Sequence, residues 1–150
     1  MTFYKLSSNF VRLDRALILS GVWQSLTGTS IKVYLIFRSK AYWKEDKKKG
    51  IWYISNNGEL EFTYREAEKN YKISRQSFKT ALVELVEKGL LDIKRPGAPY
   101  KKVTSLYAIS ERWRKWGQDD FKAVRMEKRP AQGGFHVQKQ EIVPVLLKLN

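Results

Sequence analysis

Two short groups of basic and polar side chains have the types and the spacing needed to contact a polyanion. The first group lies within residues 74–80 and consists of Ser74, Arg75, Gln76, Ser77, Lys79 and Thr80. Lysine, serine and threonine donate to phosphate oxygens, whereas arginine favours guanine and glutamine favours adenine in two-point contacts with base edges. This stretch therefore predicts contact with both the phosphates and the bases of a nucleic acid. The alternative is an ordinary solvent-exposed helix face with mixed charges.

The second group flanks the stretch Pro96-Gly97-Ala98-Pro99 and consists of Lys94, Arg95, Lys101 and Lys102. Two prolines and a glycine exclude a regular helix or strand here and favour a stiff turn. A turn rimmed with cations suits a loop that crosses a phosphate backbone and reaches the neighbouring minor groove. The alternative is a charged hairpin that only faces solvent.

Residues for catalysis or metal binding are sparse. The chain has no cysteine and one histidine, His136, so thiolate metal sites and disulfides are excluded. The aspartates that a nuclease would need are dispersed along the chain, at Asp14, Asp46, Asp92 and the pair Asp119-Asp120. Metal-dependent or nucleophilic chemistry needs such groups clustered with suitable partners. We therefore expect a non-enzymatic protein with no cofactor and no metal site.

Charge and composition agree with a polyanionic partner. Lysine and arginine number 29 against 15 acidic residues, which gives a formal net charge of +14 and a pI near 10.0. Such an excess attracts nucleic acid over distances of about a Debye length. Arg12, Asp14 and Arg15 interrupt the first apolar stretch, so it does not read as a signal peptide, and no apolar run is long enough for a bilayer. We expect a cytoplasmic, nucleoid-associated protein with no membrane contact.

The elements that must position the two groups can be read from caps and periodicity. Apolar residues recur at helical spacing over 75–88, namely Phe78, Ala81, Leu82, Leu85 and Val86. This stripe faces a core and turns the first group outward, with Ser74 as N-cap and Gly89 as the stop. A shorter helix over 63–71 begins with a Thr63–Glu66 capping box and joins it through Lys72-Ile73. Strands over 90–94 and 104–109 then enclose the loop that carries the second group.

The remaining chain predicts supporting elements. Helical segments between 13 and 26 break at Ser20-Gly21, and Thr27 caps a buried helix that runs to about residue 41 or 43. Residues 44–50 read as a charged loop, and Asn57-Gly58 predicts a hairpin that pairs 51–54 with 59–62. Ser110 is expected to cap a last short helix over 111–116, closed by Gly117.

Two interpretations are open for several aromatic side chains, and two for the basic residues of the last short helix. Trp52, Trp113, Trp116 and Tyr107 could stack on single-stranded bases, but we expect them to pack in the core. Arg112, Arg114 and Lys115 either contact phosphates or face water.

At residues 50–117 the chain resembles the winged helix-turn-helix superfamily, in particular small prokaryotic, phage or plasmid members. The stretches that carry the resemblance are 56–58, 63–67, 73–78, 85–91 and 105–117, and the lead-in at 10–37 is similar to that of some replication initiators. The resemblance implies DNA binding, with Arg75, Gln76, Ser77, Lys79 and Thr80 at recognition positions and Lys94, Arg95, Lys101 and Lys102 in the wing. One departure is the turn Tyr71-Lys72-Ile73, where such proteins usually have glycine.

These observations predict a mainly α fold with a small β part, an α+β winged helix-turn-helix with an N-terminal helical extension. We expect one domain over 1–120, with N-terminal helices at 11–43 and a core at 50–117, followed by a basic, loosely ordered tail over 121–150. The expected function is duplex DNA binding in transcription or replication, with helix 75–88 in the major groove and wing 94–103 on the backbone. A homodimer would suit a two-fold DNA site, and a basic groove does not by itself distinguish DNA from RNA. The alternative is a protein assembly module that uses the apolar tail.

Overall fold

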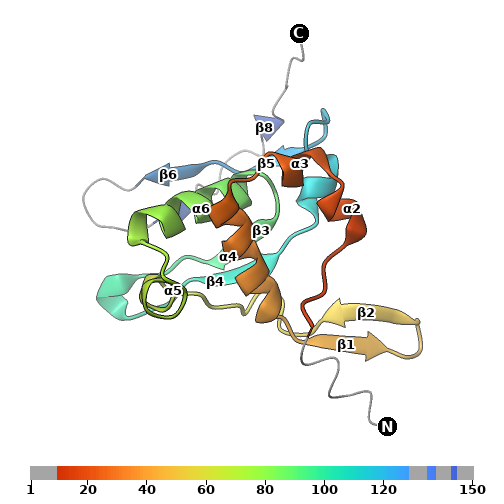
Figure 1. Cartoon of the computed structure of the whole chain (residues 1–150), viewed down its shortest axis with the longest axis horizontal. Coiled ribbons are helices and arrows are strands. Elements are labelled where there is room, and N and C mark those ends of the chain that lie inside the picture. Colours follow the sequence, from red (N-terminus) through yellow and green to blue (C-terminus); the bar gives the residue numbers. More distant parts are fainter. Residues whose placement is uncertain (1–9, 129–134, 138–142, 145–150) are drawn as a thin grey trace.

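Helix α4 (Gly28–Ser39) and helix α6 (Arg75–Glu87) pack against each other at the centre of a mixed α+β fold (Figure 1). The computed structural model describes residues 10–128, 135–137 and 143–144. Val33, Tyr34 and Phe37 of α4 are buried, so this helix is the central one that the sequence predicts. Its N-cap is Thr27, whose hydroxyl accepts a hydrogen bond from the Ser30 amide at 3.3 Å. The helix ends at Ser39, earlier than expected, because Trp43 already begins a strand.

The predicted break in the N-terminal helical region is confirmed. Helix α2 (Arg15–Ile18) and helix α3 (Gly21–Gln24) are single turns that meet at Leu19 and Ser20. The Ser20 hydroxyl accepts from the Trp23 amide at 3.2 Å and so caps α3. Leu17 and Val22 anchor the two turns in the core.

The first hairpin differs from the predicted one. Strand β1 (Trp43–Asp46) pairs antiparallel with strand β2 (Ile51–Ile54), so part of the predicted charged loop at 44–50 is a strand. The turn forms because the Asp46 carboxylate accepts from the amides of Lys48 and Lys49, at 3.0 and 3.3 Å. Gly50 then adopts a φ of 65°.

The predicted pairing of 51–54 with 59–62 through Asn57-Gly58 is wrong. Asn57 instead binds the backbone of Ile109, donating to its carbonyl at 3.0 Å and accepting from its amide at 2.7 Å. Leu60 forms a β-bridge with Tyr107, and Leu60 and Phe62 are buried. The turn itself forms at residues 55–58, with Gly58 at a φ of 92°, but burial of Leu60 and Phe62 and the hydrogen bonds to Ile109 direct the chain after it to β4 rather than back along β2.

Helix α5 (Tyr64–Tyr71) and α6 follow the predicted boundaries closely. The Thr63 hydroxyl accepts from the Glu66 amide at 3.1 Å, and the Ser74 hydroxyl accepts from the Ser77 amide at 3.2 Å. The second half of the expected capping box is wrong, because the Glu66 carboxylate pairs with Lys40 of the α4 C-cap. Gly89 ends α6 with a φ of 84°, as predicted.

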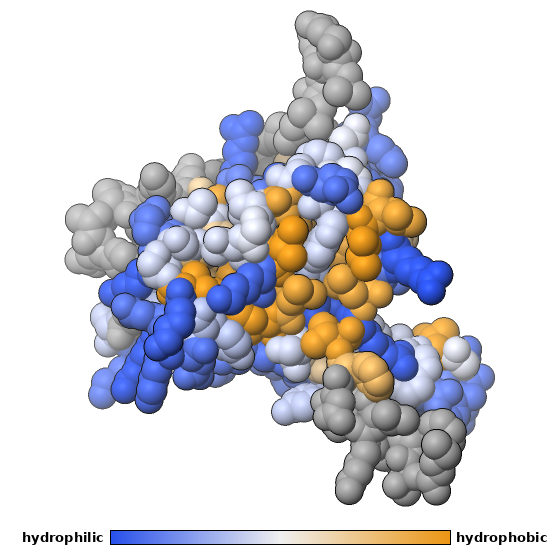
Figure 2. Space-filling view, viewed as in Figure 1, coloured by the Kyte–Doolittle hydropathy of each residue, from blue (hydrophilic) through white to orange (hydrophobic). Residues whose placement is uncertain are grey.

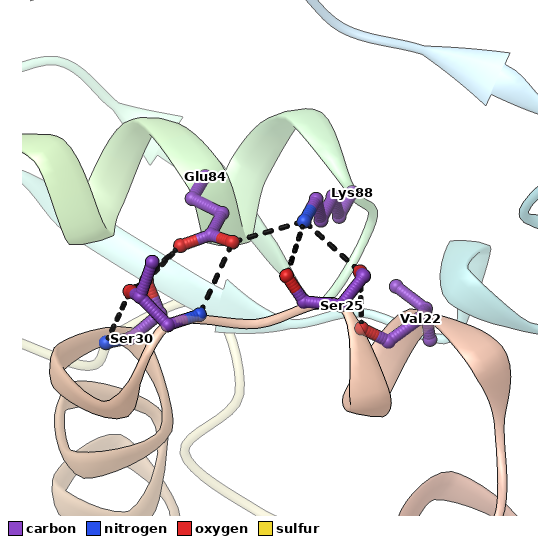
Figure 3. A network of polar contacts seen from close by, with 6 residues as sticks. Val22, Ser25, Ser30, Glu84 and Lys88 are labelled. Atoms are coloured by element: carbon purple, nitrogen blue, oxygen red, sulfur yellow. Dashed lines mark hydrogen bonds and ion pairs between the residues drawn. The ribbon is translucent and has the colours of Figure 1, made fainter.

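A polar network joins the start of α4 to the side of α6 (Figure 3). The Glu84 carboxylate accepts from the hydroxyls of Ser30 and Thr27, the latter at 3.0 Å, and from the Thr27 amide at 3.4 Å. Lys88 pairs with Glu84 at 2.9 Å and donates to the carbonyl of Ser25 at 3.0 Å. Glu84 therefore supplies an acidic cap to the positive end of a neighbouring helix.

The second hairpin matches the predicted strands. Strand β3 (Leu91–Arg95) pairs antiparallel with strand β4 (Leu106–Ile109), with a register shift between Ile93 and Arg95. The loop between them contains a 3₁₀ turn, η1 (Pro99–Lys101). On the other edge of β4, Leu60 forms an antiparallel β-bridge with Tyr107 and so adds a single-residue third strand.

Aromatic rings join these elements into one core. Phe37 of α4 lies edge-to-face with Phe62 and with Tyr107 of β4, at centroid distances of 5.4 and 5.0 Å. Phe62 in turn packs on Phe78 of α6 at 4.7 Å. The apolar stripe predicted for this helix is buried in full, at Phe78, Ala81, Leu82, Leu85 and Val86.

Packing continues past the predicted domain boundary at residue 120. A 3₁₀ helix, η2 (Arg112–Lys115), replaces the expected helix at 111–116, and Phe121, Ala123 and Met126 are buried beyond it. Strand β5 (Lys122–Ala123) pairs with β8 (Val143–Pro144), and β6 (Met126–Lys128) pairs with β7 (Phe135–Val137). The rest of the predicted tail, and the rest of its apolar run at 142–147, lies outside the described residues. None of the helices in the described part of the chain is long and apolar enough to cross a membrane.

Candidate nucleic-acid interface

The start of α6 presents the first predicted group to solvent. Five of its members are exposed and Lys79 is half-buried; the exposed side chains are Ser74, Arg75, Gln76, Ser77 and Thr80. The hydroxyl of Ser74 also donates to the hydroxyl of Ser77 at 2.9 Å, so the cap stays in place. The other amides of the first helical turn lie at the positive end of the helix, where anions bind favourably.

The guanidinium of Arg75 packs over the aromatic ring of Tyr64. Its guanidinium lies 5.7 Å from the ring centroid of Tyr64, and Tyr64 packs edge-to-face on Phe78 at 5.0 Å. Burial raises the pKa of Tyr64, and the nearby Tyr107 raises it further, while Arg75 lowers it. The phenol therefore stays neutral and offers its ring face to Arg75. A guanidinium held in this way loses less freedom when it binds a base or a phosphate.

Gln76 and Thr80 lie one helical turn apart and contact each other. The Gln76 amide donates to the Thr80 hydroxyl at 3.4 Å, which is long for a hydrogen bond. Both side chains are exposed. The contact orients the amide without occupying it fully, so Gln76 remains able to make a two-point contact with an adenine edge.

The β3–β4 loop presents the second predicted group on a rigid tip. Ala98 and Val103 exchange backbone hydrogen bonds at 2.9 and 3.1 Å, and the Gly97 amide donates to the Ser105 hydroxyl at 2.8 Å. A Cβ on Gly97 would meet that hydroxyl at 2.8 Å, so the loop can close only with glycine there. The four cations Lys94, Arg95, Lys101 and Lys102 are all exposed. Lys94 falls at the register shift between β3 and β4, between Ile93 and Arg95.

The loop also carries an aromatic side chain that sequence reasoning missed. Tyr100 is 76% exposed, and Lys101 lies with its ammonium 5.6 Å from the ring centroid. A large ring in a turn beside two prolines and a glycine could have been noticed, because nothing in the turn can bury it. Tyr100 therefore extends the basic tip with a flat apolar surface.

Arg75 of the first group and the four cations of the second group have no ion-pair partner in the described part of the chain. Five other cations are paired: Lys40 with Glu66, Lys88 with Glu84, Arg112 with Asp92, Arg114 with Asp14 and Glu111, and Lys115 with Asp120. Positive charge is thus left uncompensated at Arg75 and at the second group.

The two groups lie at the same end of the molecule. In Figure 1 the β3–β4 loop, α5 and the start of α6 form one side, whereas the β1–β2 hairpin projects from the opposite side. The two elements that carry the groups also pack against each other, since α6 contacts β3. Arg75 is not covered by the N-terminal helices, since α4 contacts α6 through Glu84 on another face.

Other predicted contact residues are used inside the protein. Arg112 donates to Asp92 at 2.8 Å and to the carbonyls of Val86 and Leu91, so it holds the end of α6 to β3. Both readings left open for Arg112 are therefore wrong, because its guanidinium binds protein groups.

The remaining side chains of that segment divide between solvent and core. Arg114 and Lys115 do face water, but each is also paired with carboxylates of this chain. Tyr107 and Trp113 are buried as expected and Trp116 is half-buried, but Trp52 is exposed, contrary to expectation.

Within the described residues, no three histidine, cysteine, aspartate or glutamate side chains gather in a way that could hold a metal ion. No family model, no curated protein and no solved structure matches this chain.

Proposed function

We propose that this protein binds duplex DNA as a winged helix-turn-helix protein. In this proposal α6 enters the major groove with its first two turns, and the β3–β4 loop acts as the wing that contacts the backbone. The order α4, short strand at Leu60, α5, α6, β3, loop, β4 supports the assignment, since it is the element order of that fold. The fold by itself does not imply the activity.

The observation that carries the proposal is the set of exposed cations without acidic partners at one end of the molecule. A cation already paired gains little from a phosphate, because the exchange replaces one ion pair by another. Arg75 and the four cations of the β3–β4 loop have no such competitor among the described residues. They can neutralise phosphates and release the counterions that dominate DNA affinity.

The proposed role is that of a non-enzymatic transcriptional regulator or replication-associated factor acting in the cytoplasm. A homodimer would match a two-fold DNA site. The alternative role as a protein assembly module relied on the apolar tail. We favour DNA, since Val143–Pro144, the described part of that tail, pairs with Lys122–Ala123 of the same chain.

The test begins with selection of a bound duplex from a random pool, followed by titrations at fixed salt. Arg75→Ala is expected to weaken the selected duplex by about 1–3 kcal/mol and to affect unrelated duplexes less. Lys101→Ala together with Lys102→Ala should weaken all duplexes alike and reduce the salt slope by about 0.9 per lysine.

Lys122→Ala is the matched control, because it removes one exposed charge from β5, away from the proposed interface. Equal affinity of the Arg75 variant, the Lys101/Lys102 variant and the parent for the selected duplex at matched salt would overturn the proposal. A duplex RNA of the same sequence, added as competitor, separates DNA from RNA recognition, since its major groove does not admit a helix.

A further inference from the structure

The β1–β2 hairpin exposes large side chains that the core does not use. Tyr42 is 70% exposed, Ile51 52%, Trp52 46% and Tyr53 45%. The hairpin projects from the body on the side opposite to the β3–β4 loop (Figure 1), and in the space-filling view it forms a separate lobe with hydrophilic and hydrophobic residues together (Figure 2). These exposed side chains are therefore accessible to a partner.

The strand register gathers two tyrosines and a lysine on one face. Lys44 lies opposite Tyr53, and the Ser55 amide donates to the Tyr42 carbonyl at 2.8 Å, which places Tyr42 opposite Ser55. Residues that alternate along a strand share a face. Tyr42 and Tyr53 are therefore diagonal neighbours on the same face, at a spacing of about 7–8 Å between backbones.

The opposite face of the hairpin is held to the body by cations. The Arg12 guanidinium lies 4.2 Å from the ring centroid of Trp52 and 5.5 Å from that of Trp43. Arg38, which is buried, lies 5.2 Å from Trp43 and donates to the Arg12 carbonyl at 2.7 Å. This anchoring fixes which face points outward, and that face is the one with Tyr42, Lys44 and Tyr53.

The charges around the tyrosines are positive and uncompensated. Lys44 and the turn residues Lys47, Lys48 and Lys49 are exposed, and none of them is ion-paired to a carboxylate in the described part of the chain. Asp46 lies on the same face, two residues beyond Lys44, and its carboxylate accepts from the amides of Lys48 and Lys49. Glu45 lies opposite Trp52, on the other face.

We infer that this face of the hairpin, with Tyr42, Lys44, Tyr53 and the turn lysines, binds a single strand of nucleic acid. Unpaired bases stack on the two tyrosine rings, and the lysines bind the phosphates between and beyond them. Aromatic rings interleaved with cations are the combination that takes up single strands without sequence preference. A second copy of this chain is disfavoured as occupant, because both copies carry +14 and the same lysines would meet.

The experiment uses the full chain and a fluorescently labelled thymidine oligonucleotide, in anisotropy titrations at several salt concentrations. The parent is expected to bind, and Tyr42→Ala with Tyr53→Ala is expected to lose about 5-fold to 150-fold in affinity per stacked base. The matched variant Tyr42→Phe with Tyr53→Phe keeps both rings and should bind like the parent. Replacing Lys47, Lys48 and Lys49 by glutamine should lower the salt slope by about 0.7 for each phosphate that the protein no longer neutralises.

An oligonucleotide with abasic sites keeps the phosphates but has no bases at those sites to stack on the tyrosines. The parent and the alanine variant should therefore bind it with the same, weaker affinity. Arg75→Ala should leave the thymidine oligonucleotide bound and weaken only the duplex, so that failure of one site is distinguishable from failure of the other. The inference is overturned if the parent does not bind the oligonucleotide, or if the alanine variant binds it as tightly as the phenylalanine variant. It is also overturned if sedimentation shows a dimer of the parent that the alanine variant dissolves.

Discussion

Lys72 adopts a backbone conformation that lysine ordinarily avoids. It follows α5 with φ 57° and ψ 35°, in the left-handed region, and its amide donates to the Ala67 carbonyl. The connection between α5 and α6 is therefore short, with Lys72 and Ile73 between Tyr71 and the Ser74 cap. The side chain is exposed, so burial does not offset the strain.

Lys72→Gly should therefore stabilise the protein. The left-handed conformation costs a non-glycine residue about 1–2 kcal/mol, and glycine removes this cost. Glycine also increases the entropy of the unfolded chain, which offsets about 0.4–1 kcal/mol of that gain in stability. We expect the free energy of unfolding to rise by about 0.5–1 kcal/mol in urea titrations. The control is Lys69→Gly in the helical part of α5, which should lower it by about 1 kcal/mol. A loss of stability in the Lys72 variant would contradict the strain argument.

At the level of helices and strands, the caps were predictable from sequence because each depends on atoms a few residues apart. Thr27, Thr63 and Ser74 all cap their helices, and Gly89 ends α6. The first hairpin was not predictable in the same way. Asn57-Gly58 has a strong local turn preference, but Asn57 is held by Ile109, which lies far along the chain.

The exposed face of α6 was predictable for a related reason. Its apolar stripe fixes which side is buried, so the polar group at 74–80 had to face outward. What the sequence could not show is the partner of each charged side chain. Glu84 of α6 binds the start of α4, and Arg112 binds groups of α6, β3 and β5, including the Lys122 carbonyl at 2.8 Å.

Glu84 makes the contact between α4 and α6 dependent on pH. Its partial burial raises the pKa of the carboxyl, but the hydrogen bonds from Ser30, Lys88 and Thr27 together lower this pKa below its ordinary value. A carboxyl whose pKa is lower in the folded state contributes stability that is fully present above its unfolded pKa. That contribution is lost as the pH falls through the folded pKa.

Glu84→Gln should thus be destabilising near neutral pH and nearly neutral in acid. We expect a loss of about 1–3 kcal/mol at pH 7, since hydrogen bonds to a charged group are removed. The difference between variant and parent should shrink as the pH falls below about 4.3, the usual glutamate value. Denaturant titrations across this range measure it. Glu68→Gln, on the exposed face of α5, is the control and should show no such difference.

For the whole molecule, the distribution of charge matters more than its total. Six carboxylates of the described chain form ion pairs with cations, whereas the cations at the β3–β4 hairpin and the lysines at the β1–β2 hairpin are in none of these pairs. The net charge of +14 predicts a polyanionic partner but does not place it. The two hairpins that carry these unpaired cations lie on opposite sides of the molecule (Figure 1).

Salt should therefore act on stability and on DNA binding in opposite directions. Raising sodium chloride screens the repulsion within each cationic end, so the melting temperature should rise. Over the same change from about 50 mM to about 200 mM, duplex affinity should fall roughly 100-fold for four phosphates contacted. Thermal melts and anisotropy titrations in matched buffers test both. Replacing Lys47, Lys48 and Lys49 by glutamine should reduce the rise in melting temperature, and an unchanged rise would contradict this explanation.

The clamp between Asn57 and Ile109 also bears on how this protein ages. Asparagine before glycine is prone to deamidation, because the glycine nitrogen can attack the side-chain amide and form a succinimide. Here both amide atoms of Asn57 are engaged by the Ile109 backbone, which keeps the carbonyl carbon away from that attack. Once converted to aspartate, the side chain would set a carboxylate oxygen against the Ile109 carbonyl and release β4 from residues 57–60. The rate of deamidation at Asn57, measured by mass spectrometry, should therefore report how often the hydrogen bonds between Asn57 and Ile109 open.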